Sequence, residues 1–316
     1  MEKIDISIVV PLYNESASLP HLIERLEKLR TKLPGLSIEI IFVDDGSKDN
    51  TGEIIQQLAL SQLHYQAILL SRNYGHQLAL TCGLAQVRAT QAVMVIDGDL
   101  QDPPELLTSF YEYYKQGSDV VYAVRQKRKE SFFKKTAYYF FYRILKSISY
   151  VDIPLDSGDF CLMSRRVVDV LNQMPEESRY LRGMRSWIGF KQTGVEYERE
   201  ERIAGSSSYS LKDLIRLAYN GIFNFSEFPI KFIKRLGYAA ICASFIYFVY
   251  SLIMKFVYQN VPQGFTALLF TFILFSGIQF LSLGIIGEYI LRIFFQVKNR
   301  PLYIVKNKIV NKEITH

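Results

Sequence analysis

A short apolar run that stops at carboxylates constrains the fold most strongly. Residues 93–96 are too few to cross a membrane, and Asp97, Gly98 and Asp99 follow them at once. A run of this length with polar residues directly after it is typical of a buried parallel strand. Because ligands of open α/β sheets bind beyond the carboxyl ends of the strands, we expect Asp97 and Asp99 to lie in a crevice at that edge.

The spacing of these two carboxylates suits a hard divalent cation. Mg²⁺ and Mn²⁺ favour oxygen ligands and often share them with substrate phosphates, so Asp97 and Asp99 are candidate metal ligands. An isolated Asp-x-Asp sequence is also compatible with a solvated turn, followed here by a helix that Pro103 and Pro104 open. Three further strand ends of the same kind favour a metal site over a solvated turn.

Three other apolar runs also end in polar residues. The run 5–11 precedes Tyr13 and Glu15, the run 38–43 precedes Asp44 and Asp45, and the run 67–70 precedes Arg72 and Asn73. With a fifth run at 119–124 and helical patterns between the runs, they predict right-handed βαβ units and a doubly wound, mostly parallel sheet. Four polar strand ends on one edge form a candidate site. No glycine-rich dinucleotide fingerprint or P-loop occurs, so a nucleotide would be held by stacking on Tyr13 and by carboxylates.

The net charge indicates which kind of partner the chain binds, and the cysteines and the N-terminus indicate the compartment in which it lies. The net charge of the 316 residues is +6, and the basic residues gather beside the apolar runs of the last third. This arrangement favours anionic lipid over nucleic acid. The three cysteines form no close pair, so neither a zinc site nor a disulfide framework is indicated. The N-terminus lacks a basic signal-peptide region, and we expect the first domain to be cytoplasmic.

Two long apolar runs, 237–258 and 265–290, predict a membrane hairpin, and each holds one charged residue near its end, Lys255 and Glu288. Each has about the 20 residues needed to cross a bilayer. Basic residues lie before and after the pair at Lys231, Lys234, Arg235, Arg292, Lys298, Arg300, Lys306 and Lys308. The uncharged loop 259–264 lies between the runs, so the positive-inside rule places both termini in the cytoplasm. A buried helical hairpin of a soluble protein is the alternative.

These patterns divide the chain into four parts. A cytoplasmic catalytic domain is expected at 1–210, juxtamembrane helices at 211–235, the transmembrane hairpin at 236–296 and a cytoplasmic tail at 297–316. The aromatic and basic stretch 132–150 and the amphipathic stretch 211–232 are typical of elements in a headgroup layer, although 132–150 fits an ordinary core helix equally well. A Gly- and Ser-rich loop at 199–209 is a lid candidate.

The motifs together resemble the family 2 glycosyltransferases of GT-A fold, and within them the membrane-anchored polyprenyl-phosphate glycosyltransferases related to dolichol-phosphate mannose synthase. The matching stretches cover nearly the whole chain in order, at 10–15, 43–47, 71–76, 97–105, 157–160, Arg202-x-x-Gly205 and 284–289. Ser208 departs from the pattern, because many relatives carry a lysine before the tyrosine.

The resemblance implies a role for each site residue. Residues that would hold the nucleoside are Pro11, Tyr13, Glu15, Asp44 and Asp45. Asp97 and Asp99, with Gln101 nearby, would hold Mg²⁺ or Mn²⁺ on the diphosphate. Arg125 and Arg202 would meet the acceptor phosphate. Asp159 would lie near the transfer centre as an orienting group or weak base, and a helix cap is its structural alternative.

The reaction that this resemblance implies is inverting transfer of one sugar from a nucleotide sugar to a polyprenyl phosphate on the cytoplasmic leaflet. UDP-glucose and undecaprenyl phosphate are the leading pair of substrates. A dolichol-phosphate mannose synthase that uses GDP-mannose is the enzymatic alternative, and a catalytically degenerate membrane adaptor is the non-enzymatic one. Association with a second copy of the chain is left open.

Overall fold

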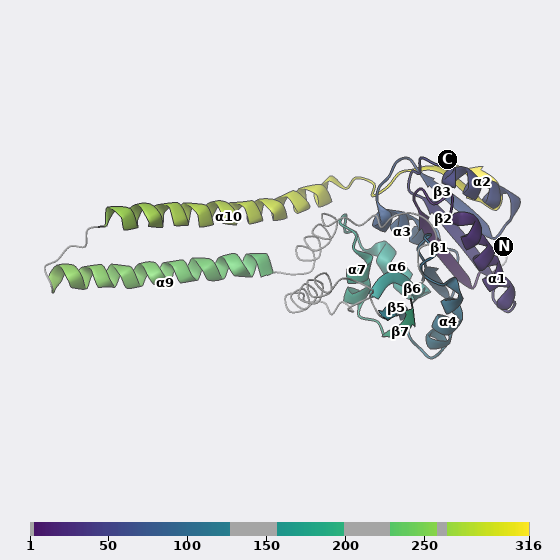
Figure 1. Cartoon of the computed structure of the whole chain (residues 1–316), viewed down its shortest axis with the longest axis horizontal. Helices are drawn as coiled ribbons and strands as arrows, with labels where there is room; N and C mark the ends of the chain where they lie inside the picture. The colour runs from purple at the N-terminus through teal and green to yellow at the C-terminus, as the bar shows by residue number, and fades with distance from the viewer. Residues whose placement is uncertain (1–2, 127–156, 199–227, 258–263, 316) are drawn as a thin grey trace. The chain divides into compact units, whose positions relative to one another are not determined.

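The computed structural model describes residues 3–126, 157–198, 228–257 and 264–315 (Figure 1). The chain forms two compact units. The first contains the described residues up to 198 together with 300–315, and the second contains 228–257 and 264–299. Each unit is described here by itself.

A nine-stranded mixed sheet forms the centre of the first unit, in the order β7-β5-β6-β4-β1-β2-β3-β8-β9. Its strands are β1 (Ile6–Leu12), β2 (Ile38–Asp44), β3 (Tyr65–Leu70), β4 (Ala92–Val95), β5 (Val120–Gln126), β6 (Ser157–Ser164), β7 (Gln192–Glu198), β8 (Val305–Val310) and β9 (Glu313–Thr315). β1 pairs in parallel with β2 and β4, β2 pairs in parallel with β3, and β5 pairs in parallel with β7. These pairings confirm the predicted doubly wound, mostly parallel sheet.

Two strands run against this direction. β6 pairs antiparallel with both β4 and β5, and β8 pairs antiparallel with β3. β6 was not among the predicted strands. Its position beside β4 brings residue 159 next to the end of the strand that leads to Asp97.

Helices cover both faces of the sheet (Figure 1). They are α1 (Leu19–Lys32), α2 (Thr51–Ser61), α3 (His76–Ala85), the short 3₁₀ helix η1 (Pro104–Leu106), α4 (Leu107–Lys115), α6 (Arg165–Gln173) and α7 (Leu181–Ile188). α1 buries a leucine every three or four residues against one face, as an amphipathic helix must. On the opposite face α3 approaches closely, because a Cβ at Gly83 would lie 2.3 Å from Val9 Cγ1.

The C-terminal residues complete the sheet of the first unit. β8 pairs with β3 and buries Ile309 fully, while β9 folds back on β8. The Ser71 N–H donates to the carbonyl oxygen of Ile304 at 2.9 Å. The sequence pattern predicted only a tail over 297–316, whereas the structure makes residues from 305 onward an integral edge of the catalytic sheet.

The second unit consists of α9 (Phe228–Phe256) and α10 (Phe265–Lys298), which contact each other. Both are long and apolar enough to cross a membrane. With 29 and 34 residues they measure roughly 44 and 51 Å at 1.5 Å per residue, which exceeds the roughly 30 Å of a bilayer's hydrocarbon core. Near the end of α10, Glu288 forms an ion pair with Arg292 at 2.9 Å. This pairing provides a partner for the one acidic residue of the second apolar run.

Candidate active site

The loops that follow β1 and β2 are tied together by hydrogen bonds. Asn14 adopts a positive φ of 55°, and its side-chain oxygen accepts from the Lys48 N–H at 2.8 Å. The Asn14 N–H in turn donates to Ser47 Oγ at 2.9 Å. Tyr13, between this contact and the end of β1, keeps 43% of its surface exposed. Its ring is therefore available for stacking, with Pro11 just before it inside β1.

Asp44 and Asp45 are both buried at the end of β2, and burial raises the pKa of each carboxyl group. Asp44 accepts from the Ser47 N–H at 3.2 Å. Asp45 uses both oxygens on the loop before α3, accepting from the Tyr74 N–H at 2.7 Å and from the Gly75 N–H at 2.8 Å. Asp45 thereby positions the start of α3.

Close packing explains the glycine between Asp97 and Asp99. A Cβ at Gly98 would lie 2.4 Å from Leu12 Cδ2. The carbonyl oxygen of Gly98 accepts from Ser18 Oγ at 3.2 Å, and Ser18 also donates to the Glu15 carboxylate at 2.8 Å. The structure thus brings Glu15 and the loop after β4 (Ala92–Val95) together, as the sequence predicted for polar strand ends.

The loop that carries Asp99 holds a strained residue. Leu100 has a φ of 61° and is fully buried. A bulky side chain in this left-handed region costs on the order of 1–3 kcal/mol. The strain persists because Leu100 is packed in the core and Asp99 Oδ1 accepts from the Gln101 N–H at 3.2 Å. The backbone between Asp99 and Gln101 is therefore held in one conformation.

His76 lies between two of the predicted site carboxylates. His76 Nε2 is 2.9 Å from Asp97 Oδ1, and His76 Nδ1 is 3.7 Å from Asp159 Oδ2. Loss of water around the ring by itself lowers the pKa of His76. The negative charge of Asp97, its hydrogen bond and the charge of Asp159 outweigh this effect and raise the pKa to about 9. The imidazole is then a cation that bridges the ends of β4 and β6 at neutral pH.

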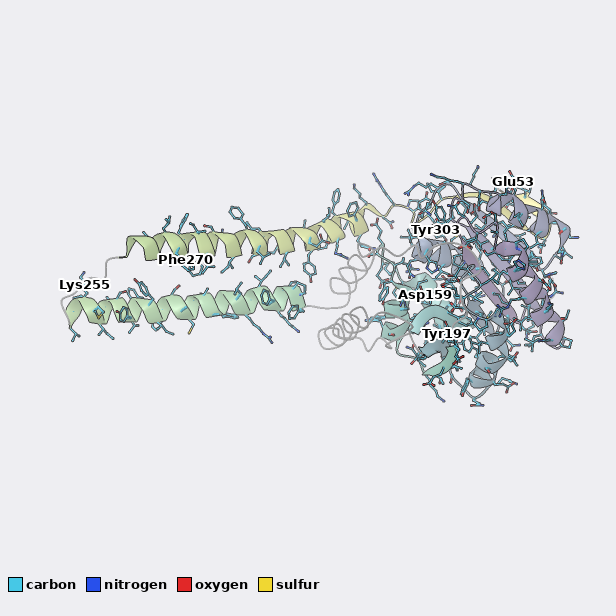
Figure 2. All side chains as sticks on the ribbon, viewed as in Figure 1. Glu53, Asp159, Tyr197, Lys255, Phe270 and Tyr303 are labelled. Atoms are coloured by element: carbon cyan, nitrogen blue, oxygen red, sulfur yellow. The ribbon has the colours of Figure 1, made fainter. Side chains whose placement is uncertain are left out.

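Asp159, labelled in Figure 2, is hydrogen-bonded at one carboxylate oxygen and ion-paired at the other. Arg182 Nε lies 3.1 Å from Oδ1, and Gln77 Nε2 donates to Oδ2 at 2.9 Å. The side chain is only 11% exposed. Asp97, His76, Asp159 and Arg182 thus form a chain of alternating charge at the edge of the sheet where β4 ends and β6 begins.

Asp102 lies apart from this cluster. It is fully buried and accepts a hydrogen bond from the Tyr197 hydroxyl, which joins the loop after β4 to β7. Phe160 meets the Tyr197 ring edge-on at 5.9 Å between centroids. These contacts make Asp102 a structural anchor for the loop that carries the Asp-Gly-Asp sequence.

Several residues predicted to belong to the site or to the membrane-facing elements lie outside the part of the chain that the structure describes. Arg125 belongs to β5, where its backbone is paired with Tyr197, but its side chain is not described. Arg202, Ser208, the lid candidate 199–209, most of the two headgroup-layer stretches and the loop 258–263 fall outside the described residues.

Sequence reasoning missed three side chains of the site: His76, Gln77 and Arg182. His76 stands in the stretch 71–76 that carried the resemblance, and its position directly after a predicted strand end was a usable signal. Gln77 and Arg182 gave none, because a glutamine and an arginine in helical patterns are usually surface residues.

Comparison with known proteins places this site in a family. The sequence profile of Glycosyl transferase family 2 matches residues 7–171, which run from β1 into α6. The chain belongs to glycosyltransferase family 2. The resemblance drawn from the motifs is thereby confirmed, and His76, Asp97 and Asp159 lie within the matched region.

The similarity to individual family 2 glycosyltransferases extends beyond the matched domain. The glycosyltransferase YkcC of Bacillus subtilis strain 168 is 44% identical over 314 residues, which cover 98% of this chain and 97% of that protein. The SfII prophage-derived bactoprenol glucosyl transferase of Shigella flexneri is 37% identical over 302 residues, covering 95% and 97%. The crystal structure of S. aureus TarS 1–349 has a TM-score of 0.46 at 17% identity, covering 70% of this chain and 66% of that one.

Proposed function

We propose that this chain transfers a single sugar, with inversion, from a nucleotide sugar to a polyprenyl phosphate at the cytoplasmic face of a membrane. The substrates proposed are UDP-glucose and undecaprenyl phosphate. The similarity to a bactoprenol glucosyl transferase over nearly the full length of both chains carries this proposal. The two apolar helices support it further, since a lipid acceptor requires an enzyme that stays at the membrane.

The donor set after β4 fits a divalent cation that shares its ligands with a substrate. Asp97 and Asp99 supply carboxylate oxygens at a strand end, and the Asp97 side chain is 26% exposed. The described residues contain no group of three or more His, Cys, Asp or Glu that would enclose an ion on their own. Asp97, Asp99 and Gln101 would therefore hold Mg²⁺ or Mn²⁺ through few protein ligands, as is usual for cations on phosphates. When bound, the ion supplies positive charge to stabilise the leaving diphosphate.

The nucleoside part of the donor is assigned to the loops after β1 and β2. Tyr13 offers an exposed ring for stacking on the base. Glu15, at the Ser18 contact, adjoins the loop of Gly98, so nucleoside and diphosphate would be bound by loops already joined to each other. Pro11 and Asp44, which are buried at the ends of β1 and β2, would also contact the nucleoside. Asp45 would act on the nucleoside site by holding the loop before α3.

A phosphate acceptor reduces the need for a strong base. Its second pKa lies near 6, so a lipid phosphate is largely ionised at neutral pH. Asp159 would then chiefly orient the acceptor and the groups around it. Arg125 and Arg202 are proposed to hold the acceptor phosphate by charge-assisted hydrogen bonds. Arg202→Ala should weaken lipid-phosphate binding and transfer while nucleotide-sugar binding changes little.

A substrate panel tests the proposal. The purified full-length protein is incubated with undecaprenyl phosphate or dolichyl phosphate, a set of UDP- and GDP-sugars, and Mg²⁺, Mn²⁺ or EDTA. We expect a glycolipid to form from UDP-glucose and to disappear with EDTA. Product from GDP-mannose alone would support the mannose synthase alternative. Donor binding without any glycolipid would contradict the proposal and favour the adaptor.

A further inference from the structure

One side chain, Gln77, joins three elements at the site. It is the second residue of α3, and its Nε2 donates to Asp159 Oδ2 in β6 at 2.9 Å. Its Oε1 accepts from the backbone N–H of Leu181, the first residue of α7, also at 2.9 Å. Both ends of the amide are therefore engaged, and each contact requires a different end.

The contact between Gln77 and Leu181 also affects the second carboxylate oxygen of Asp159, through the residue that follows Leu181. Arg182 follows Leu181 directly, and its Nε lies 3.1 Å from Asp159 Oδ1. Gln77 thus donates to one carboxylate oxygen itself and fixes the start of the helix that carries the ion-pair partner of the other. The positions of both oxygens depend on this one amide.

We propose that Gln77 is a positioning residue for sugar transfer, which sets the Asp159 carboxylate relative to Asp97 and the reacting groups. The inference rests on the proposed function of the site. A displacement of about 1 Å in such a group can lower a rate on the order of 100-fold. Only an amide of this length serves, because the side chain must donate toward Asp159 and accept from Leu181.

A pair of substitutions separates the two contacts. Gln77→Glu has the same shape and keeps an acceptor for the Leu181 N–H, but it turns a second acceptor toward Asp159. Gln77→Leu removes both contacts, together with the 3.4 Å contact between Gln77 Nε2 and His76 Nδ1. A matched control is Gln56→Glu on α2, where the amide donates only to the Gly52 carbonyl oxygen within its own helix, at 3.1 Å.

The kinetic measurement is kcat and KM for the nucleotide sugar in the transfer assay, with thermal unfolding measured in parallel. We expect Gln77→Glu to lower kcat by roughly 10- to 100-fold, to leave the donor KM within about twofold, and to unfold near the wild-type temperature. Gln56→Glu should behave as wild type. Wild-type kcat in Gln77→Glu would overturn the proposal. A loss of donor binding that parallels a lowered unfolding temperature would also overturn it, since Gln77 would then be a residue of the fold.

A second measurement is independent of the substrate. Trp187, the single tryptophan of the chain, lies on α7 and is 56% exposed, so its fluorescence reports on that helix. We expect Gln77→Leu to shift the Trp187 emission and to speed amide exchange at Leu181, and Gln77→Glu to do neither. Unchanged emission and exchange in Gln77→Leu would contradict the positioning geometry even if the lipid acceptor proved wrong. A wild-type protein that transfers no sugar to lipid would count against the proposed function alone.

Discussion

At the scale of single residues, the site depends on side chains that arrive from distant parts of the sequence. His76 and Asp97 are 21 residues apart, Gln77 and Asp159 are 82 apart, and Leu181 and Gln77 are 104 apart. Asp97 was predictable because it follows an apolar run directly, whereas the role of Asp159 was predicted only through the family resemblance. Gln77 and Arg182 were not, since their roles arise from the antiparallel placement of β6 and from the start of α7, which no local pattern encodes.

Removal of either Asp97 or Asp99 should nearly abolish transfer without unfolding the protein. Both lie after a strand end, outside the core, and the loss of one electrostatic stabiliser of the transition state costs about 10²–10³ in rate. Initial rates of Asp97→Ala and Asp99→Ala over a range of Mg²⁺ and Mn²⁺ concentrations check this. Glu112→Ala, an exposed carboxylate paired with Lys115, is the control. Near-normal turnover of both variants at limiting metal would refute the metal assignment.

At the scale of elements, three strands escaped prediction, β6, β8 and β9, and all of them join the sheet from far along the chain. Residues 305–310 include two lysines and an asparagine, and only Ile309 is buried among them. A strand that buries only one side chain has no hydrophobic alternation from which it could be predicted. The central strands were predictable because they are buried on both faces and therefore apolar throughout.

Ile309→Ala should destabilise the first unit by about 2–5 kcal/mol, the usual loss for truncation of a fully buried isoleucine. Ile314→Ala in β9 is the matched control, because Ile314 is 51% exposed and its truncation should cost less than about 0.5 kcal/mol. Denaturant unfolding of the purified protein measures both. Equal stability of the two variants would mean that β8 contributes little to the sheet.

The junction of β5, β6 and α6 should show pH-dependent stability. Arg166 donates twice to the Asp119 carboxylate, with both distances 2.5 Å, and thereby holds the pKa of Asp119 below its usual range, assisted by Ser164. Because the pKa is lower in the folded state, the stabilisation is present above the unfolded pKa of about 3.9 and disappears as pH falls through the folded value.

Comparison of the wild type with Asp119→Asn tests the direction of this pH dependence of stability. The difference in unfolding midpoint should be constant from pH 7 to about pH 5 and should shrink toward zero as the solution becomes more acidic. A difference that grows on acidification would contradict the assigned role of Arg166.

At the scale of the whole molecule, the long helices of the second unit predict a defined topology. The basic residues that flank α9 and α10 favour cytoplasmic termini, so the loop 259–264 should face the other side of the membrane. In a Cys242→Ser background, Gln263→Cys should react with an impermeant thiol reagent in intact cells, and His316→Cys should react only after lysis. Cys82 and Cys161 are buried and should contribute no labelling. The reverse pattern would invert the orientation.

The pairing of β8 with β3 sets an order of events during biosynthesis. Lys308 contacts Gln86 across 222 residues, a distance that a ribosome covers in roughly 11–44 s at about 5–20 residues per second. Throughout that interval the outer edge of β3 has unpaired backbone groups, and such an edge invites aggregation. Both apolar helices emerge before the strand that covers it. β3 therefore gains its pairing strand only after both apolar helices have left the ribosome. A chain cut short before Val305 would leave the backbone groups at the outer edge of β3 unpaired.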